Sequence, residues 1–149
     1  MKLVDTCALA KLYVAEPDSD AFETWFADVM PVKISRLTTV EFESVLGKYT
    51  RTGRLSAATA GGVLAAFDED ISAGCLQIVE FSVAEFELAR ALIRKHASRG
   101  LRSLDALQLA AALAARTELF VTADRKLAGA AAAEGLQVLA FLLEPPALR

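Results

Sequence analysis

The sequence predicts an α/β protein built around a mainly parallel sheet, and two observations support this fold class. Short β-type segments alternate with longer helical segments along the 149 residues, as expected for β-α-β crossovers between parallel strands. Most of the short segments, such as LQVLAFL near the end, are largely continuous apolar runs rather than alternating ones. Strands of that composition have both faces covered, so we expect helices on both sides of the sheet.

The elements follow one another in a regular order. Five strands are expected at residues 2–5, 32–35, 76–81, 118–122 and 136–142. Seven helices are expected at about 6–15, 19–29, 38–51, 56–73, 83–98, 103–116 and 124–134. Pro17 and Pro31 end helical stretches, and the glycine of TRTGRLS marks a turn between the third and fourth helices. Because these two helices follow each other before the third strand, they form a helical-hairpin insertion, a place suited to a partner or a dimer contact.

Composition narrows the class of protein. Apolar residues make up 54% and charged residues 23% of the chain, which predicts a single folded domain over residues 1–149, with a loose tail at residues 143–149. No apolar stretch reaches the roughly 18 residues of a membrane span, and the first residues lack the features of a signal peptide. We therefore expect a soluble, cytoplasmic protein. The alanine-rich stretches LAAALAA and AGAAAAEG are expected to let helices pack close to the sheet.

The few cysteine and histidine residues argue against several kinds of site. Cys7 and Cys75 have no CxxC spacing and are expected to be reduced thiols. With one histidine, His96, a zinc site of the nitrogen–sulfur type is hard to build, and no GxSxG motif suggests a Ser-His-Asp triad. His96, at the end of a helical run, is expected to be a surface residue or a C-terminal residue that interacts with the helix dipole, rather than a catalytic base. The net charge of −3 argues against an overall basic nucleic-acid footprint and leaves a local one open.

Four acidic residues stand where a strand passes into a helix, or near the start of a helix. Asp5 ends the first strand, and Glu41 follows the second within SRLTTVEFESVL. Asp105 lies in LRSLDALQLAAAL, and Asp124 follows the fourth strand in FVTADRKLAG. The carboxyl ends of parallel strands share one edge of the sheet, where open α/β sheets bind their ligands. We therefore expect the four carboxylates to point into one crevice.

Each acid, taken singly, is explained equally well as part of a helix start. Asp5 and Asp124 can be N-caps, and TTVE at residues 38–41 fits a capping box. Ser103 can cap its helix and leave Asp105 in the first turn, where the helix dipole favours a negative charge.

Taken together, the acids favour a metal site. Four neighbouring carboxylates repel one another and cannot all stay charged unless a cation compensates them. Oxygen-only ligation suits Mg²⁺ or Mn²⁺. A metal held by carboxylates is a common way to attack phosphodiester bonds.

On these motifs, the sequence resembles the PIN-domain ribonucleases, in particular the VapC-type toxins of toxin–antitoxin pairs. The resemblance rests on VDTCALAKLYVAEPDS, ISRLTTVEFESVLGK, LRSLDALQLAAAL and FVTADRKLAGAAAAEGLQV, which follow the family's order and span nearly the whole chain. It implies a three-layer α/β/α domain with a five-stranded parallel sheet. It also implies Mg²⁺- or Mn²⁺-dependent endoribonuclease activity, inhibition by a cognate antitoxin protein, and a homodimer.

The resemblance also assigns roles to the acids. Asp5, Glu41, Asp105 and Asp124 take the family's acidic positions. Asp5 and Asp105 are the expected central metal ligands, with Asp124 and Glu41 completing the shell directly or through water. Glu43 stands two residues from Glu41, about 200° away around the helix, so only one of the two glutamates can face the site.

Other residues are expected to position the acids or the substrate. Thr122 fits the family's hydroxyl position, and Thr6 directly follows the first acid. Cys7 stands where the family often has a serine, and a thiol is a weaker hydrogen-bond partner than a hydroxyl. Arg102 and Arg125, each near a site acid, can contact the RNA backbone or be ordinary surface charges.

Two other functions are open on the sequence alone. The chain can be a PIN-like binding or assembly module that has lost catalysis, although the presence of all four acids argues against this. A phosphatase of the haloacid dehalogenase type also begins with an acid after its first strand. That chemistry usually has a second acid two residues later, where this chain has Cys7. The sequence identifies neither the RNA target nor the number of metal ions.

Overall fold

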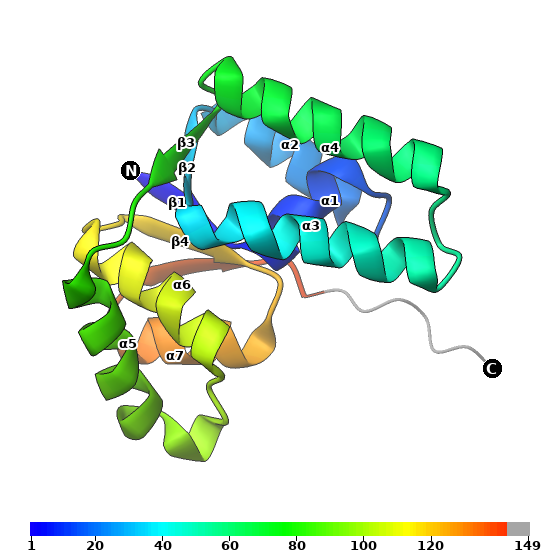
Figure 1. Ribbon diagram of the computed structural model, residues 1–149. Helices are drawn as coiled ribbons and strands as arrows, with labels where there is room; N and C mark the ends of the chain where they lie inside the picture. Colours follow the sequence, from blue (N-terminus) through cyan, green and yellow to red (C-terminus); the bar gives the residue numbers. More distant parts are fainter. Residues whose placement is uncertain (143–149) are drawn as a thin grey trace.

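The computed structural model of the protein describes residues 1–142 and arranges five strands in one parallel sheet (Figure 1). In spatial order the sheet runs β3 (Leu76–Val79), β2 (Val32–Ser35), β1 (Lys2–Val4), β4 (Leu119–Thr122) and β5 (Gln137–Ala140). Each neighbouring pair of strands is parallel. The predicted α/β fold with a five-stranded parallel sheet is confirmed, whereas the tail predicted at residues 143–149 lies outside the described residues.

Helices cover both faces of this sheet. One layer contains α1 to α4, and the other contains α5 to α7 (Figure 1). No helix in the described range is long and apolar enough to cross a membrane. The helices are α1 (Thr6–Tyr13), α2 (Ser19–Val29), α3 (Arg36–Arg51), α4 (Ala57–Ser72), α5 (Val83–Lys95), the short 3-10 helix η1 (Ala97–Arg99), α6 (Ser103–Ala114) and α7 (Arg125–Ala133).

Two apolar cores lie on opposite faces of the sheet, because successive side chains of a strand point to opposite sides. In β1, Val4 packs with α1 to α4 while Leu3 packs with α5 to α7, and Val121 and Phe120 of β4 divide in the same way. Small side chains let α6 and α7 approach the sheet, as the alanine-rich stretches predicted. The buried alanines of these two helices are Ala106, Ala110, Ala111, Ala112, Ala130 and Ala131.

β1 stands at the centre of the sheet, and the chain builds outward from it on both sides. The next two strands in the sequence, β2 and β3, lie on one side of β1, and the last two, β4 and β5, lie on its other side. The carboxyl end of β1 is therefore the point where the strand order reverses, which is where open α/β sheets bind ligands. The predicted helical hairpin is present, because α3 and α4 pack against each other before β3 begins (Figure 1).

Some element boundaries differ from the prediction. Asp5 is not part of β1, because it leaves the strand to cap α1. α3 begins at Arg36, since Ser35 ends β2 and takes the N-cap position. Thr38 is consequently buried within the first turn, and the capping box expected at residues 38–41 is wrong.

One more expectation near a helix end is wrong, and another is confirmed in one of its two forms. Arg102 takes the N-cap position of α6, so Ser103 is the first helical residue rather than the cap. His96 takes the C-terminal cap position of α5, as the second of its two expected placements had it, and it is buried there. Its Nε2 is 2.7 Å from Oε1 of Glu134, and this contact with the end of α7 explains the burial.

Candidate active site

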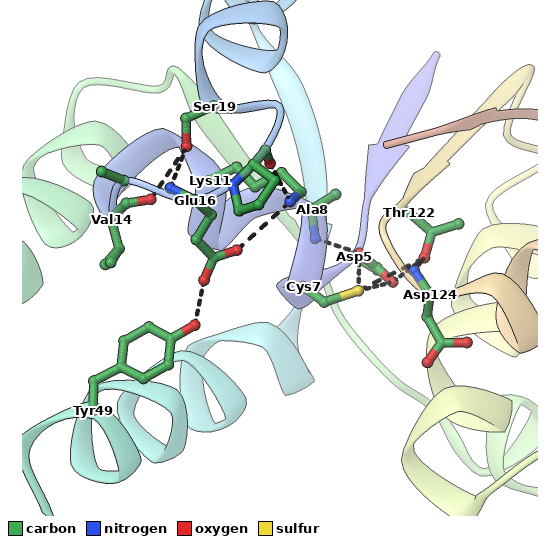
Figure 2. Close-up of polar contacts among 12 residues, drawn as sticks. Asp5, Cys7, Ala8, Lys11, Val14, Glu16, Ser19, Tyr49, Thr122 and Asp124 are labelled. Carbon is green, nitrogen blue, oxygen red and sulfur yellow. Dashed lines mark hydrogen bonds and ion pairs between the residues drawn. The ribbon is translucent and has the colours of Figure 1, made fainter. Parts of the chain in front are cut away.

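Asp5 is both a helix cap and a buried acid. Its side chain is only 2% exposed, and its Oδ1 accepts a hydrogen bond from the Ala8 amide at 2.9 Å. Its Oδ2 accepts one from the Thr122 hydroxyl at 2.5 Å, and the Cys7 thiol lies 3.2 and 3.1 Å from the two oxygens (Figure 2). Burial raises the pKa of Asp5 to about 6, and the negative charge of Glu41 adds to this rise, while the hydrogen bonds oppose it.

Glu41 approaches Asp5 from the second turn of α3. Its Oε1 accepts hydrogen bonds from the Thr6 hydroxyl at 2.9 Å and from Nε2 of Gln108 at 2.6 Å. Glu43, two residues later, is exposed and lines a separate depression between α3 and α4. The helical period therefore turns Glu41, and not Glu43, toward Asp5.

Asp105 and Asp124 form the other side of the cluster. Asp105 lies in the first turn of α6, where Nε of Arg102 is 3.4 Å from its Oδ2. Partial burial raises the pKa of Asp105, and the charge of Asp124 raises it further, against the opposing effect of Arg102. Asp124 caps α7 by accepting a hydrogen bond from the Leu127 amide at 2.8 Å. Asp5 is therefore close enough to Glu41, and Asp105 to Asp124, for their negative charges to repel each other.

All four acids line one cleft of about 380 Å³ at the carboxyl edge of β1. Carboxylates dominate its charge, since Arg102 is the one basic side chain that residues 1–142 contribute to the lining. Its remaining walls are mostly apolar or neutral. The other lining residues are Thr6, Cys7, Leu37, Val40, Ser44, Val45, Leu104 and Gln108. Sequence reasoning correctly brought the four acids to one crevice.

The remaining predicted site residues differ in their distance from the cleft. Thr6 and Cys7 line the cleft, and Thr122 is fully buried behind Asp5. Desolvation and the Asp5 charge raise the pKa of the Cys7 thiol well above its ordinary value, so the thiol stays protonated and can donate to Asp5. Arg125 is exposed at the start of α7 and does not line the cleft.

Sequence reasoning missed a set of neutral polar residues beneath the acids. Gln108 and Thr38 are almost fully buried, and Nε2 of Gln108 lies 3.1 Å from Oγ1 of Thr38. The Ser35 hydroxyl donates to Oε1 of Gln108 at 2.9 Å. The available signal was one polar residue in the apolar run LQLAAALAA, one helical turn after Asp105.

The residues of the cleft fit a divalent cation in chemistry and charge. Carboxylate oxygens are the ligands that Mg²⁺ and Mn²⁺ prefer, and the raised pKa values of Asp5 and Asp105 reflect acids without full compensation by the protein. Across residues 1–142, however, no three His, Cys, Asp or Glu side chains form a preassembled metal site. The donor set is therefore suitable, and its side chains are not already gathered around one point.

Comparison with known proteins identifies a family model and several solved structures. The model described as "PIN domain" matches residues 2–133. A comparison with curated proteins found no significant match.

Solved structures with a similar fold include proteins from three bacteria. A toxin–antitoxin complex from Klebsiella pneumoniae is 22% identical, with a TM-score of 0.65 over 97% of this chain and 100% of that one. VapC20 of Mycobacterium tuberculosis, a Sarcin-Ricin loop cleaving toxin, is 18% identical, with a TM-score of 0.70 over 97% and 100%. VapBC2 of Rickettsia felis, bound to a promoter DNA fragment, is 18% identical, with a TM-score of 0.66 over 94% and 98%. At these identities the likeness is one of fold.

Proposed function

This chain belongs to the PIN-domain family, and from that premise we propose that it is an endoribonuclease that depends on Mg²⁺ or Mn²⁺. The observation that carries the proposal is the cleft lined by Asp5, Glu41, Asp105 and Asp124. Four helices or helix starts deliver these acids to one place, and one arginine is the basic side chain that accompanies them in the described part of the chain. Such an excess of negative charge suits a site that acts on a phosphodiester only when a cation is bound.

The proposed roles of the acids are those of the family positions that they take. Asp5, Asp105 and Asp124 would hold the metal, with Glu41 completing the shell directly or through water. A bound Mg²⁺ or Mn²⁺ supplies polarisation of the phosphoryl group and a lowered pKa for water. The Thr122 hydroxyl holds Oδ2 of Asp5, and Thr6 holds Oε1 of Glu41. These contacts keep both carboxylates oriented while the substrate binds.

Arg102 and Arg125 are the proposed substrate-binding cations. Arg102 lines the cleft beside Asp105, and Arg125 follows Asp124 at the start of α7. Both side chains are exposed, so both can reach phosphate groups of an RNA strand on either side of the bond to be cut.

We further propose that the chain is the toxin of a VapBC-type pair, with a cognate antitoxin protein and a homodimer as its assemblies. Support comes from the shared fold of the toxin and toxin–antitoxin structures above. A catalytically inactive binding module is disfavoured by the retention of all four acids in the cleft. A phosphatase of the haloacid dehalogenase type is disfavoured by the family match and by Cys7, which stands where that chemistry usually has a second acid.

The proposal is tested by RNA cleavage with the purified chain in Mg²⁺, in Mn²⁺ and in EDTA. Asp5→Asn and Asp105→Asn are expected to abolish cleavage while the variants stay folded. Glu43→Gln removes a glutamate from the same helix as Glu41, but on the face that lies outside the cleft, and should retain full activity.

Three results would count against different parts of the proposal. Cleavage that persists in EDTA, or in both aspartate variants, would mean that the acids are helix caps without a catalytic role. Absence of cleavage together with absence of any metal-dependent rise in melting temperature would remove the metal site as well. Metal binding without cleavage would keep the site and reject the RNA offered as its substrate.

A further inference from the structure

Gln108 is a buried amide on the floor of the cleft. It lies on α6, three residues after Asp105, and its side chain is only 2% exposed. Its Oε1 accepts a hydrogen bond from the Ser35 hydroxyl at 2.9 Å. Its Nε2 donates to Oε1 of Glu41 at 2.6 Å and lies 3.1 Å from the hydroxyl oxygens of Thr6 and Thr38. Both ends of the amide are therefore engaged.

The surroundings fix which way the amide points. A carboxylate can only accept hydrogen bonds, so the end of Gln108 that faces Glu41 must be the NH₂ group. Ser35 holds the opposite end by donating to the carbonyl oxygen. Reversing the amide would place its carbonyl oxygen against the Glu41 carboxylate, so that two acceptors face each other, and would remove the hydrogen bond that Gln108 donates to Oε1.

This contact leaves Glu41 with one occupied oxygen and one free oxygen. Oε1 accepts from both Thr6 and Gln108, while Oε2 has no hydrogen-bond partner among residues 1–142. In that range Thr117 supplies the one buried side-chain polar atom without a partner, so Oε2 of Glu41 keeps access to solvent. Since Glu41 lines the cleft, Oε2 is the oxygen available to a ligand there.

Gln108 also connects the two helices that carry opposite sides of the acid cluster. It belongs to the Asp105 helix and bonds to Glu41 on α3, and the two helices are in contact. An apolar side chain would fill this place in the apolar part of α6 after Asp105 without needing partners, whereas a buried amide is costly unless it is fully hydrogen-bonded. Its presence therefore needs a reason beyond packing.

We propose that Gln108 is a positioning residue, which holds Glu41 with Oε2 directed into the cleft and sets the spacing between Glu41 and Asp105. This inference rests on the proposed function, because the role assigned to Oε2 is to complete the shell of the metal ion. Ser35 acts one step further away, by keeping the amide of Gln108 in the required orientation.

The test measures Mn²⁺ affinity by calorimetry for the wild type, Gln108→Leu and Leu109→Val. Loss of an outer partner of a metal ligand typically weakens metal binding by roughly 10- to 100-fold, and we expect that loss for Gln108→Leu. Leu109→Val is the matched control, because this neighbour on α6 packs in the apolar core on the other side; it should bind Mn²⁺ as the wild type does. In a Glu41→Gln background, Gln108→Leu should cause no further loss, since the residue it positions is gone.

A second readout needs neither metal nor activity. In ¹H–¹⁵N spectra of the metal-free chain, one side-chain amide proton of Gln108 should be shifted downfield by its bond to the carboxylate, and Glu41→Gln should reverse the shift. An amide signal that ignores Glu41→Gln overturns the inference, as does a folded Gln108→Leu variant that binds Mn²⁺ as tightly as the wild type. A wild-type chain that neither binds Mn²⁺ nor cleaves RNA instead overturns the proposed function, together with the role that depends on it.

Discussion

The two ends of α1 carry polar clusters that differ in how their negative charge is compensated (Figure 2). Beyond the C-terminal end, Glu16 lies 3.7 Å from Nζ of Lys11 and 3.6 Å from the Arg54 guanidinium, and it accepts a hydrogen bond from Tyr49. At the N-terminal end, Asp5 accepts hydrogen bonds from neutral groups, and residues 1–142 provide it with no ion pair. We call the first group the Glu16 cluster and the second the acid cleft.

The difference supports a structural role for the Glu16 cluster and the proposed ligand-binding role for the acid cleft. In the Glu16 cluster the protein supplies its own cations, and Lys11 also donates to the Pro17 carbonyl at 2.6 Å, so the charges are satisfied when folding is complete. In the acid cleft, residues 1–142 supply hydrogen bonds to Asp5 and Glu41 and no matching cation for either. The cleft is therefore left with a charge that a ligand can compensate, at a cost in stability of the folded chain.

The largest effect on stability is expected from breaking the Glu16 cluster. Lys11→Met removes a 5%-exposed cation and leaves part of the Glu16 charge uncompensated. Removal of one partner from a buried pair typically costs about 3–5 kcal/mol, and because Arg54 and Tyr49 remain, we expect a loss of about 3 kcal/mol in denaturant unfolding. RNA cleavage by the folded variant should be unchanged.

The control for this prediction is Lys48→Met, which removes an exposed lysine of α3 and should change stability by less than about 0.5 kcal/mol. Adding Glu16→Gln to Lys11→Met should recover part of the lost stability, because the two residues are coupled. If Lys11→Met instead lowered cleavage without lowering stability, the proposed separation of roles would be wrong.

In the acid cleft, removing a charge is expected to stabilise the folded chain rather than destabilise it. The pKa of Asp5 rises from 3.8 to about 6 on folding, so between these pH values the folded chain keeps a proton that the unfolded chain has released. Stability in EDTA should therefore fall as the pH rises from about 4 to about 6. The difference in pKa corresponds to a destabilisation of about 3 kcal/mol at pH 7. A substitution that removes the carboxylate should recover less than this amount, because it also removes hydrogen bonds that the carboxylate accepts.

Asp5→Asn should accordingly raise the melting temperature in EDTA at pH 7, while the two chains converge near pH 4. Asparagine remains a good N-cap, which keeps the start of α1 intact. Added Mn²⁺ should stabilise the wild type and leave the variant unaffected. A variant that is less stable than the wild type at every pH would mean that the hydrogen bonds to the Asp5 carboxylate stabilise the fold by more than its burial destabilises it.

Local pattern was sufficient for much of the fold. The predicted bounds of β2 and α2 match the structure, because each is enclosed by residues that end it, such as Pro31 between them. The start of α3 was missed because TTVE has the form of a capping box. In the folded chain the hydroxyl of Thr38 instead meets Gln108, a contact 70 positions away in sequence that no local rule contains.

The candidate site was predictable only in part, for a similar reason. The acids could be brought together because parallel strands place their carboxyl ends on one edge, so position along each strand sufficed. Gln108 could not be found in this way, since its partners Thr6, Ser35 and Glu41 lie 102, 73 and 67 residues away. The Glu16 cluster was missed too, because Glu16 and Tyr49 meet only after the α3–α4 hairpin has docked on α1.

A smaller effect should come from removing one neutral donor from the Glu16 cluster. Tyr49→Phe keeps the ring beneath Arg54, which lies 4.2 Å from its centre, and deletes the hydroxyl that donates to Glu16. Hydrogen bonds to charged groups contribute about 1.5–3 kcal/mol. Because Lys11 and Arg54 still compensate the Glu16 charge, we expect a loss of stability near the lower figure. Denaturant unfolding measures it, and RNA cleavage should not change. A loss of cleavage at unchanged stability would connect this cluster to the acid cleft.

The smallest effect is expected in a third cluster, which resembles the Glu16 cluster but is more open to solvent. Contact with Lys95, together with His96, lowers the pKa of Glu134. Stability from this shift is fully present above the unfolded pKa of about 4.3 and is lost as the pH falls through the lower folded value. Because Lys95 is 62% exposed, Glu134→Gln should cost less than about 1 kcal/mol at pH 7.

The difference in stability between Glu134→Gln and the wild type should shrink as the pH falls below about 4. The ionised Glu134 thus stabilises the fold at higher pH, whereas the ionised Asp5 destabilises it. Measured side by side in EDTA, the stability of each variant minus that of the wild type should therefore change with pH in opposite directions: it should rise with pH for Asp5→Asn and fall with pH for Glu134→Gln. If both differences changed with pH in the same direction, charge compensation would not distinguish the acid cleft from Glu16 and Glu134, and the cleft would lose its strongest physical mark as a binding site.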